Sequence, residues 1–552
     1  VEYIRLIKHK VRDDEVIQIC MEDNNWIERR FSLLEDLMDN ACKYTSDVLV
    51  LFVFNFPAPI YGIILPIAPR LPYNITEAPL GTPWPLPQLL DVTDELFVLR
   101  QSKFRFDDGG FKCDILEEAF TRYKDVIFDE PELAVHVEYP LLKELKVEVT
   151  GEKGCEKYPN SDMTESYELV IADGEASLMA LEIWGALRGL ETFSQMVYQL
   201  DDDNDGEYYI NASYVTDFPR FGYRGFMLDT CRHYMPLDTI LKHLDAMAYN
   251  KFNVFHWHIV DDQAFPYQSI KFPAMSEKGA YHPVNKIYTQ DDVAFVVEYA
   301  RLRGIRVIPE FDTPGHTYSW GKGIPNLLTE CWANGKPRQI VYDKHADFGP
   351  IHPIVNSSYE FLEDLFGEIV NVFPDRFVHL GADEVSYACW ESNPDVQLFM
   401  EQRGWSDSEY NKLEEYYQNR LFDIIIGLGS RFIIWQDPID NNVTVSNMTV
   451  VEVWKDTSLW YKLPPYRDGL EKVTKLGLKA VLSACFYLNY IDYGPDWERF
   501  YLCEPTDFNA IQGEQITQFF KMKSPTYHQN HAIEALLAEK DEFVATRTGS
   551  GK

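Results

Sequence analysis

The sequence is poor in cysteine for its length. Nine cysteines occur in 552 residues, and none of them forms a Cys-x-x-Cys pair. So sparse a set excludes a small disulfide scaffold, and the missing pairs argue against a zinc ribbon. The length favours two or three domains instead. The aromatic content of 14% is high, so ring surfaces should be plentiful in the core and at a binding site.

Positive charge is also scarce. Lys and Arg number 51 against 87 Asp and Glu, which gives a formal net charge of −36 at pH 7. This charge would repel a phosphate backbone, so the sequence predicts no nucleic-acid partner. An acidic compartment suits the composition, because many of the carboxylates would be partly neutralised there.

No apolar run long enough to span a membrane is free of proline. The most apolar stretch begins with Val48–Phe54 and is then interrupted by several prolines. Because proline breaks a helix, we predict no stable membrane span. A signal-peptide core that starts near Met38, with Lys43 as its positive residue, fits the stretch, and a mis-assembled N-terminus is an equally weighted alternative. Residues 1–73 form a divergent N-terminal segment in either case.

Five Asn-x-Ser/Thr sequons favour passage through the secretory pathway, because each is an acceptor site for N-glycosylation. Pairs of cysteines can be oxidised in that pathway. The predicted glycosylation sites are Asn74, Asn211, Asn356, Asn442 and Asn447.

Two patterns of secondary structure follow each other along the chain. Residues 74–218 combine short alternating segments, such as Tyr167–Ala172, with an amphipathic helical stretch over 180–198, which predicts a small α+β domain. From residue 219 to 510, apolar strands alternate with helices, which is typical of a (β/α)₈ TIM barrel of the α/β class. The predicted strands are 223–229, 253–259, 306–312, 377–383, 432–436, 450–454 and 479–486. An eighth strand is not recognisable, and residues 511–552 form a divergent tail.

The fourth predicted strand ends in adjacent carboxylates, Asp383 and Glu384. They end the run Val-His-Leu-Gly-Ala-Asp-Glu, in which an apolar strand stops at a small Gly-Ala pair. Consecutive strand side chains point to opposite faces, so both acids can serve one pocket only where the strand gives way to a loop. Other strand ends carry acids, histidines and aromatic residues, and the C-terminal strand ends of a TIM barrel build its active site. A solvated acidic pair on the surface is the plain alternative.

The side chains at the strand ends suit glycoside chemistry. Carboxylates hydrogen-bond sugar hydroxyls, aromatic faces stack on a sugar ring, and a carboxylic acid protonates the leaving oxygen. The sequence contains no nucleophile elbow. His256, His258 and His316 suggest a metal site, and His256 and His258 share a strand face, but His-x-His with Asp is a common buried polar pattern. We therefore predict neither a metal site nor a cofactor.

Three long runs carry a specific resemblance to a known family: LDTCRHYMPLDTILKHLDAMAYNKFNVFHWHIVDD, EYARLRGIRVIPEFDTPGHTYSWGKG and VHLGADEVSYACWESNP. They resemble the barrel of family 20 glycoside hydrolases, and more closely the animal lysosomal β-N-acetylhexosaminidases. The similarity covers roughly residues 80–510. It implies hydrolysis of terminal non-reducing N-acetylhexosamine residues of glycans, a lysosomal or secreted location, and a homo- or heterodimer.

The mechanism that this resemblance implies is substrate-assisted retaining hydrolysis, an exception to the ordinary two-carboxylate scheme. The 2-acetamido oxygen of the substrate attacks, and an oxazolinium-type intermediate forms. By position, Glu384 is the general acid and then the base that activates water, whereas Asp383 holds the acetamide and offsets its positive charge. Such an acid needs a pKa that is raised by burial or by neighbouring negative charge.

Further site residues are implied by their positions in the same alignment. Asp261 and His316 match residues that network with the acid, and Arg232 matches the residue that grips sugar hydroxyls. The matches at the pocket wall are Trp435, Trp454, Tyr487 and Asn489. The plain alternatives are a structural salt bridge for Arg232 and ordinary barrel packing for the aromatic residues. Asp229 and Asp312 are expected to serve strand-end hydrogen bonds rather than chemistry.

The resemblance also implies two disulfides, Cys113 with Cys155 and Cys331 with Cys389. The other five cysteines have no assigned partner.

Three features depart from the family pattern. Ala382 stands where a second glycine usually precedes the acids. Tyr490 replaces an arginine with which some relatives accept charged sugars, so we expect neutral substrates. After Phe508 the family's final strand and its Trp-Gly-Glu segment are not found. An active enzyme is the first hypothesis, and the alternatives are a catalytically impaired sugar-binding or partner subunit and a chitinase-like hydrolase.

Overall fold

The computed structural model describes residues 4–11, 14–21, 78–129, 139–200, 207–339, 347–456, 465–488 and 497–508. The chain divides into two units, residues 1–71 with 491–496, and the remainder. Within the first unit, strands β1 (Ile4–Val11) and β2 (Asp14–Met21) pair as an antiparallel hairpin. The sequence did not predict this hairpin, because residues 1–45 have no clear hydrophobic period.

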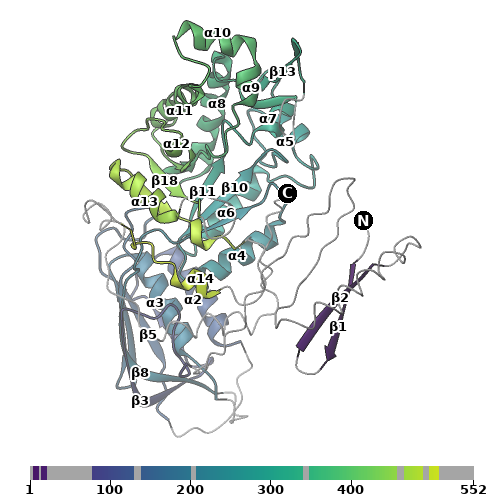
Figure 1. The fold of residues 1–552 in the computed structure, drawn as a ribbon. Helices are drawn as coiled ribbons and strands as arrows, with labels where there is room; N and C mark the ends of the chain where they lie inside the picture. Colours follow the sequence, from purple (N-terminus) through teal and green to yellow (C-terminus); the bar gives the residue numbers. More distant parts are fainter. Residues whose placement is uncertain are drawn as a thin grey trace. The chain divides into compact units, whose positions relative to one another are not determined.

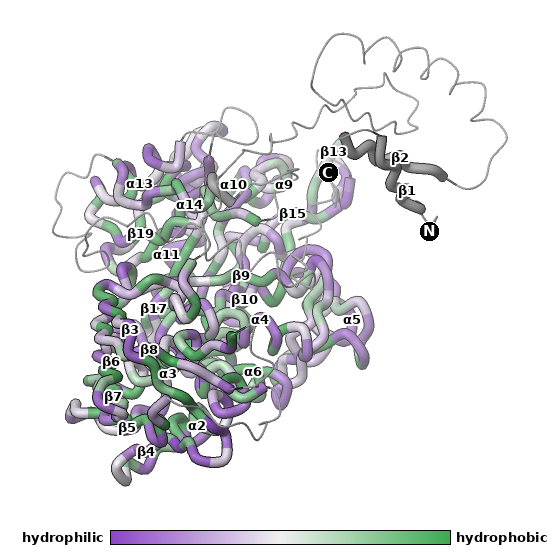
Figure 2. Tube along the Cα trace, turned by 90° about the horizontal axis from the view of Figure 1, so that it is seen from below, coloured by the Kyte–Doolittle hydropathy of each residue, from purple (hydrophilic) through white to green (hydrophobic). Residues whose placement is uncertain are grey.

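A mixed six-stranded sheet opens the second unit. Its strands lie in the order β3, β8, β6, β7, β5, β4; β5 is parallel to both neighbours and the other pairs are antiparallel. The bounds are β3 Leu89–Leu99, β4 Arg105–Asp107, β5 Glu144–Val149, β6 Tyr167–Ala172, β7 Glu175–Ala180 and β8 Tyr208–Asp217. Exposed and buried residues alternate along β7, and the sheet shows the same mixture of hydrophilic and hydrophobic positions in Figure 2. One face of this sheet is therefore apolar.

Helices α2 (Asp114–Ile127) and α3 (Ile183–Met196) pack on that apolar face (Figure 1). The strands β6 and β7 are joined by Asp173 and Gly174, whose φ values of 55° and 79° are those of a tight hairpin turn. Helix α3 also contacts the barrel, because the Arg188 guanidinium donates to the Gly304 carbonyl at 2.8 Å. The predicted α+β region before the barrel is thus confirmed.

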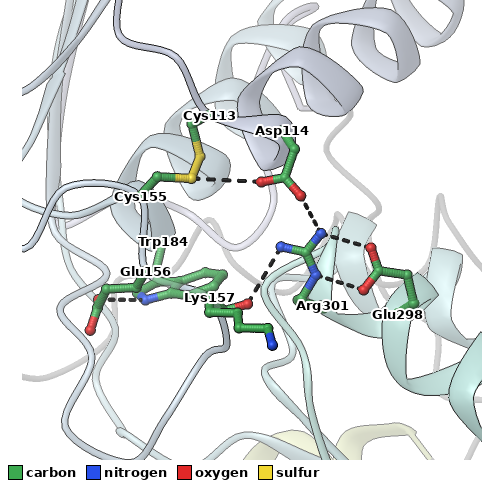
Figure 3. The surroundings of a disulfide bond; sticks show 8 residues. All are labelled: Cys113, Asp114, Cys155, Glu156, Lys157, Trp184, Glu298 and Arg301. Atoms are coloured by element: carbon green, nitrogen blue, oxygen red, sulfur yellow. Dashed lines mark hydrogen bonds and ion pairs between the residues drawn. A yellow bond between two sulfur atoms is a disulfide. The ribbon is translucent and has the colours of Figure 1, made fainter.

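Buried charges join the α+β region to the barrel. Glu165 pairs with Arg188 at 2.8 Å and with Arg224 at 2.7 Å. Figure 3 shows a second contact, beside the Cys113–Cys155 disulfide, where Arg301 bonds both Asp114 and Glu298. Because these guanidinium groups are largely withdrawn from water, the loss of one partner would leave a costly uncompensated charge.

Seven parallel strands form the barrel sheet, in the order β19, β18, β17, β16, β11, β10, β9. Their bounds are β9 Gly225–Asp229, β10 Val254–Val260, β11 Arg306–Phe311, β16 Phe377–His379, β17 Arg431–Trp435, β18 Val450–Val453 and β19 Lys479–Leu482. The long helices between them are α4 Leu237–Tyr249, α6 Gln290–Arg301, α8 Asn356–Val372, α11 Tyr410–Gly427 and α13 Tyr466–Lys475. This alternation confirms the predicted TIM-barrel class. In the described part of the chain, no eighth strand pairs with β9 or β19.

Short elements occupy the connections of the barrel. They are α5 Ala274–Gly279, α7 Tyr318–Gly323, β12 Leu328–Glu330, β13 Trp332–Ala333, β14 Lys336–Pro337, β15 Phe348–Ile351, α9 Ala388–Ser392, α10 Pro394–Gln402, α12 Asp437–Asp440, η1 Ala484–Phe486 and α14 Trp497–Leu502. All seven residues of β10 are buried, as expected for a central parallel strand that is covered on both faces.

No helix within the described ranges has both the length and the hydropathy required to cross a bilayer.

Two buried glutamates hold a proton more tightly than an ordinary carboxyl does. Glu191 in α3 accepts hydrogen bonds from Gln195 Nε2 at 2.7 Å and Tyr123 at 2.9 Å, and burial raises its pKa to about 7. Glu414 in α11 accepts from Asn441 Nδ2 at 2.9 Å, and burial raises its pKa to about 7 as well. The folded chain therefore binds protons more strongly than the unfolded chain in the mildly acidic range.

The substitution Glu191→Gln should flatten the dependence of stability on pH. The stability that this carboxyl contributes is full below its ordinary pKa of 4.5 and is lost as the pH rises through about 7. In urea titrations we expect the wild-type free energy of unfolding to fall by about 1–3 kcal/mol from pH 5 to 7.5 through this group. Glu117→Gln, an exposed change in α2, is the control. Equal slopes for wild type and Glu191→Gln would contradict the interpretation.

Candidate active site

The acid pair lies in a loop that begins earlier than the sequence predicted. Strand β16 ends at His379 rather than at Asp383. Gly381 and Ala382 have φ values of 68° and 74°, which lie outside the strand region. A Cβ atom on Gly381 would sit 1.8 Å from Asp312 Oδ1, so only glycine fits there. The chain leaves the sheet before the acids, and both acids can therefore serve one pocket.

This loop contains strained backbone on either side of Asp383. Ala382 is fully buried in the left-handed conformation, and Glu384 adopts it too, with φ of 49°. Each such non-glycine residue costs roughly 1–2 kcal/mol. The Ala382 N–H donates to Asp312 Oδ1 at 3.0 Å, which helps to hold the loop in place. Asp312 thus makes the strand-end hydrogen bond that the sequence analysis expected of it.

Asp261, which follows β10, joins three strand ends. Its Oδ2 accepts from Arg232 at 2.7 Å and lies 2.9 Å from His258 Nε2, while its Oδ1 lies 3.3 Å from His316 Nδ1. Asp229 holds the same Arg232 guanidinium at 2.8 Å. Burial acts to raise the pKa of Asp261, but His316 and the hydrogen bond with His258 hold that pKa well below its usual value. The carboxylate is therefore ionised.

His316 continues this chain of contacts to the acid pair. Its Nε2 lies 3.6 Å from Asp383 Oδ2 and 3.9 Å from Glu384 Oε2. Burial acts to lower the pKa of this imidazole, but the carboxylates of Asp312, Asp261 and Asp383 raise it well above its usual value. His316 therefore carries a positive charge beside the two acids.

The two acids differ in exposure. The Asp383 side chain is 17% exposed, whereas the Glu384 side chain is 63% exposed. Burial raises the pKa of Asp383, although His316 opposes the shift. For a general acid at Glu384, we expected burial or negative charge around this residue. In the described part of the chain, burial is found at Asp383 instead, and Glu384 lies open beside the His316 cation.

A second buried carboxylate, Glu310 in β11, binds several rings in the barrel interior. Its Oε2 lies 2.8 Å from His256 Nε2 and 2.7 Å from His258 Nδ1, and its Oε1 accepts from Trp435 Nε1 at 2.8 Å. His379 Nδ1 lies 3.4 Å from the same Oε1. Burial lowers the pKa of His379, but Glu310 outweighs it and raises that pKa to about 9. We call Glu310 with these four rings the barrel floor.

The aromatic residues expected at the pocket wall fall into two groups. Trp435 is only 4% exposed and belongs to the barrel floor. Trp454 is half-buried and lies next to Tyr487, with ring centroids 6.3 Å apart. Asn489 lies outside the described residues. The structure therefore brings Trp454 and Tyr487 together, whereas Trp435 is buried and donates to Glu310.

One charged residue of the site was not singled out from the sequence. Asp437 opens α12, two positions after the end of β17, and accepts from the Glu384 N–H at 3.3 Å and the Trp454 indole at 2.7 Å. Asp437 thus lies just beyond the C-terminal end of a barrel strand, as Asp261 does after β10. A polar residue at that position was the signal that could have identified it.

Comparison with known proteins decides the family. Residues 221–536 match the catalytic domain of glycosyl hydrolase family 20, and residues 83–196 match a domain described as beta-acetyl hexosaminidase like. The chain belongs to glycosyl hydrolase family 20. The catalytic-domain match extends past residue 510, where the sequence analysis placed the end of the barrel.

Similar family 20 proteins include animal hexosaminidase subunits. Beta-hexosaminidase subunit beta of Homo sapiens is 47% identical over 457 residues, which is 81% of this chain and 79% of the relative. Beta-hexosaminidase subunit alpha of Bos taurus is 44% identical over 439 residues, 77% of this chain and 80% of the relative. A solved chitobiase of Flavobacterium johnsoniae matches with a TM-score of 0.67 at 27% identity. It covers 80% of this chain, which spans 64% of the chitobiase chain.

Three disulfides occur among the described cysteines of this family 20 chain. They join Cys113 with Cys155, Cys331 with Cys389 and Cys485 with Cys503. The first two are the pairs that the resemblance implied, and the third involves cysteines that had no assigned partner. Cys231 is a buried free thiol that donates to Asp229 Oδ1 at 3.2 Å.

The predicted glycosylation sites occupy different environments. Asn74 lies outside the described residues. Asn211 lies in β8, where its side-chain amide is hydrogen-bonded through both of its polar atoms. Asn356 is the first residue of α8, and Asn442 and Asn447 lie between α12 and β18.

Several groups of acids and imidazoles are compact enough to share a metal ion. One such group is Asp312, His316 and Asp383. His316 Nε2 lies 3.9 Å from Asp312 Oδ2 and 3.6 Å from Asp383 Oδ2, and burial raises the pKa of Asp312 well above its usual value.

The substitution Glu310→Gln should destabilise the chain strongly. It removes the negative charge next to the imidazoles of the barrel floor. The loss of one partner of a buried ion pair typically costs about 3–5 kcal/mol of stability. We expect the free energy of unfolding in urea to fall by that amount. Asp364→Asn, which removes an exposed ion pair with Lys271, is the control and should cost about 1 kcal/mol or less. A loss as small as that of the control would contradict the description of the floor.

Proposed function

We propose that this family 20 chain is a β-N-acetylhexosaminidase that releases terminal non-reducing N-acetyl-D-hexosamine residues from glycans. The observation that carries the proposal is the loop after β16, which presents Asp383 and Glu384 together beside His316. The site lies at the C-terminal strand ends, where TIM barrels perform their chemistry. Relatives that are 47% and 44% identical bear the name beta-hexosaminidase, which supports the same activity here.

In the first step of the proposed reaction, the 2-acetamido oxygen of the substrate attacks the anomeric carbon. The bond between that carbon and the leaving oxygen breaks, and Glu384 gives its proton to the leaving oxygen. The sugar is then an oxazolinium ion, whose positive charge the Asp383 carboxylate offsets. The enzyme supplies no nucleophile of its own, in contrast to ordinary retaining glycosidases.

In the second step, water attacks the anomeric carbon from the side that the aglycone has left. The ionised Glu384 takes a proton from this water, and the bond from the anomeric carbon to the acetamido oxygen breaks. Two inversions at one carbon retain the β configuration. The leaving group and the water both pass Glu384, so its 63% exposure supports this double role.

The charged residues around the acids are proposed to bind and orient the sugar. Arg232 would donate to sugar hydroxyls, and two carboxylates, Asp229 and Asp261, already hold its guanidinium. A donor that is held in place before the substrate binds needs little reorganisation during the reaction. Asp261 and His316 then connect the sugar-binding arginine to Asp383.

The remaining assignments complete the proposal. Trp454 and Tyr487 would form an aromatic wall against the sugar, with Trp435 and Asn489 contributing to the same pocket. Residues 74–218 and 219–510 would be the accessory and catalytic domains. Because its relatives are named as subunits, we propose a homo- or heterodimer, and the sequons support a lysosomal or secreted location.

The alternative of an impaired partner subunit rests on a final strand that was not recognised. That segment lies outside the described residues, so the structure does not favour this alternative. Both acids are present, His316 contacts Asp383, and Arg232 is paired with Asp261. These contacts argue for an active enzyme.

The substitution Glu384→Gln tests the function directly. Expressed wild-type protein should release a chromophore from an aryl N-acetyl-β-D-glucosaminide at pH 4–6, and the variant should lose about 10²–10⁴-fold in kcat/KM, the usual contribution of a general acid. The loss should be smaller for an activated aryl leaving group than for a disaccharide, because a good leaving group needs less protonation. Glu391→Gln, an exposed change in α9, is the matched control. Folded wild-type protein without activity, or an unaffected Glu384→Gln enzyme, would refute the proposal.

A further inference from the structure

Asp437 occupies a junction between the acid loop and the aromatic wall, and the reaction steps above do not use it. The residue is 7% exposed, at the start of α12. Its Oδ1 accepts from the Glu384 N–H at 3.3 Å and pairs with Lys455 Nζ at 2.9 Å. Its Oδ2 accepts from the Trp454 indole at 2.7 Å. One carboxylate thus binds the backbone of one site residue and the side chain of another.

We propose that Asp437 is a positioning residue that sets the orientation of Glu384 relative to Trp454. The proposal rests on the hexosaminidase function proposed above. The acid loop has left-handed backbone at three positions, so it needs contacts that hold it. Asp312 binds the loop at the Ala382 N–H, before the acids, and Asp437 binds it at the second acid. The strained segment is therefore fixed at both ends.

Residues 454 and 455, on the aromatic-wall side of Asp437, are also held by several polar contacts. Gln436 Oε1 accepts from the backbone N–H groups of Trp454 at 2.9 Å and Lys455 at 3.0 Å. Lys455 pairs with Asp440 at 2.9 Å as well as with Asp437. Residues 454 and 455 are thus bound to the end of β17 through both backbone and side chains. The Trp454 ring cannot tilt about this backbone without losing its bond to Asp437.

Asp437 also acts on the acid pair through its charge. Burial raises the pKa of Asp383, His316 lowers it, and Asp437 and Glu310 raise it further. The titratable groups that face the two carboxylates are His316, Asp312 and Glu310 at Asp383, and Lys455 and Glu414 at Asp437. A neutral residue at 437 should therefore lower the pKa of Asp383. A residue with a purely structural role would not move this ionisation.

The test is the pH profile of Asp437→Asn with an aryl N-acetyl-β-D-glucosaminide from pH 3 to 7. We expect kcat to fall about 10- to 100-fold, because a small misplacement of the acid is costly. KM should rise less than kcat falls, since the wall keeps its ring. The acid limb of the kcat profile, which reports the ionisation of Asp383, should move to lower pH. Asp437→Glu keeps the charge and should restore the acid limb of the wild type.

The matched control is Asp440→Asn, which also loses a carboxylate on Lys455 but touches neither Glu384 nor Trp454. It should keep the wild-type acid limb. Identical profiles for Asp437→Asn and Asp440→Asn would overturn the positioning role while wild-type activity left the proposed function intact. Inactive wild-type protein would overturn the function itself. If Asp437→Asn does not fold, the smaller neutral variant Asp437→Ser replaces it. Its acid limb should also move to lower pH, and a profile identical to that of Asp440→Asn would again overturn the positioning role.

Discussion

The contacts of the ionised Asp261 carboxylate, which lies directly after β10, are those on which the rest of the site depends. This carboxylate is fully buried, yet it stays charged because Arg232, His258 and His316 surround it. A buried charge is tolerated only when its partners compensate for the lost hydration. The same three contacts tie β9, β10 and the segment after β11 together. The proposed sugar-binding residue Arg232 and the acid pair are thus linked through one carboxylate.

The acid loop shows how such a site stores strain that the surrounding structure maintains. Gly381 must pass close to Asp312, and Ala382 and Glu384 after it also have left-handed backbone, with φ values of 74° and 49°. Ala382 stands where the family usually has glycine, and its Cβ methyl group makes the left-handed conformation energetically unfavourable. Backbone hydrogen bonds to Asp312 and Asp437 compensate for part of this strain. Strained residues that are held by their surroundings are characteristic of functional sites.

Much of this arrangement could be predicted from the sequence, because apolar strands that end in polar residues place those residues at one edge of a parallel sheet. All seven predicted barrel strands are present, and the strand-end acids and histidines do converge. The early end of β16 could not be predicted, since it follows from the contact between Gly381 and Asp312, which lie far apart in the sequence. The hydrogen bond from Trp435 to Glu310 was missed for the same reason. The Cys485–Cys503 disulfide was missed because spacing alone does not identify which cysteines pair. Hydropathy patterns report which face is buried, not which partner a buried polar group finds.

In the proposed reaction the acetamido oxygen of the substrate, rather than an enzyme carboxylate, attacks the sugar. The most direct measurement compares kcat/KM for aryl β-D-glucosaminides that carry acetyl, monofluoroacetyl, difluoroacetyl and trifluoroacetyl groups on the nitrogen. Each fluorine withdraws electron density from the carbonyl oxygen and weakens it as a nucleophile. If the acetamido oxygen attacks, kcat/KM should fall steeply and progressively along this series. Equal values across the series would contradict this mechanism and would point to an enzyme nucleophile.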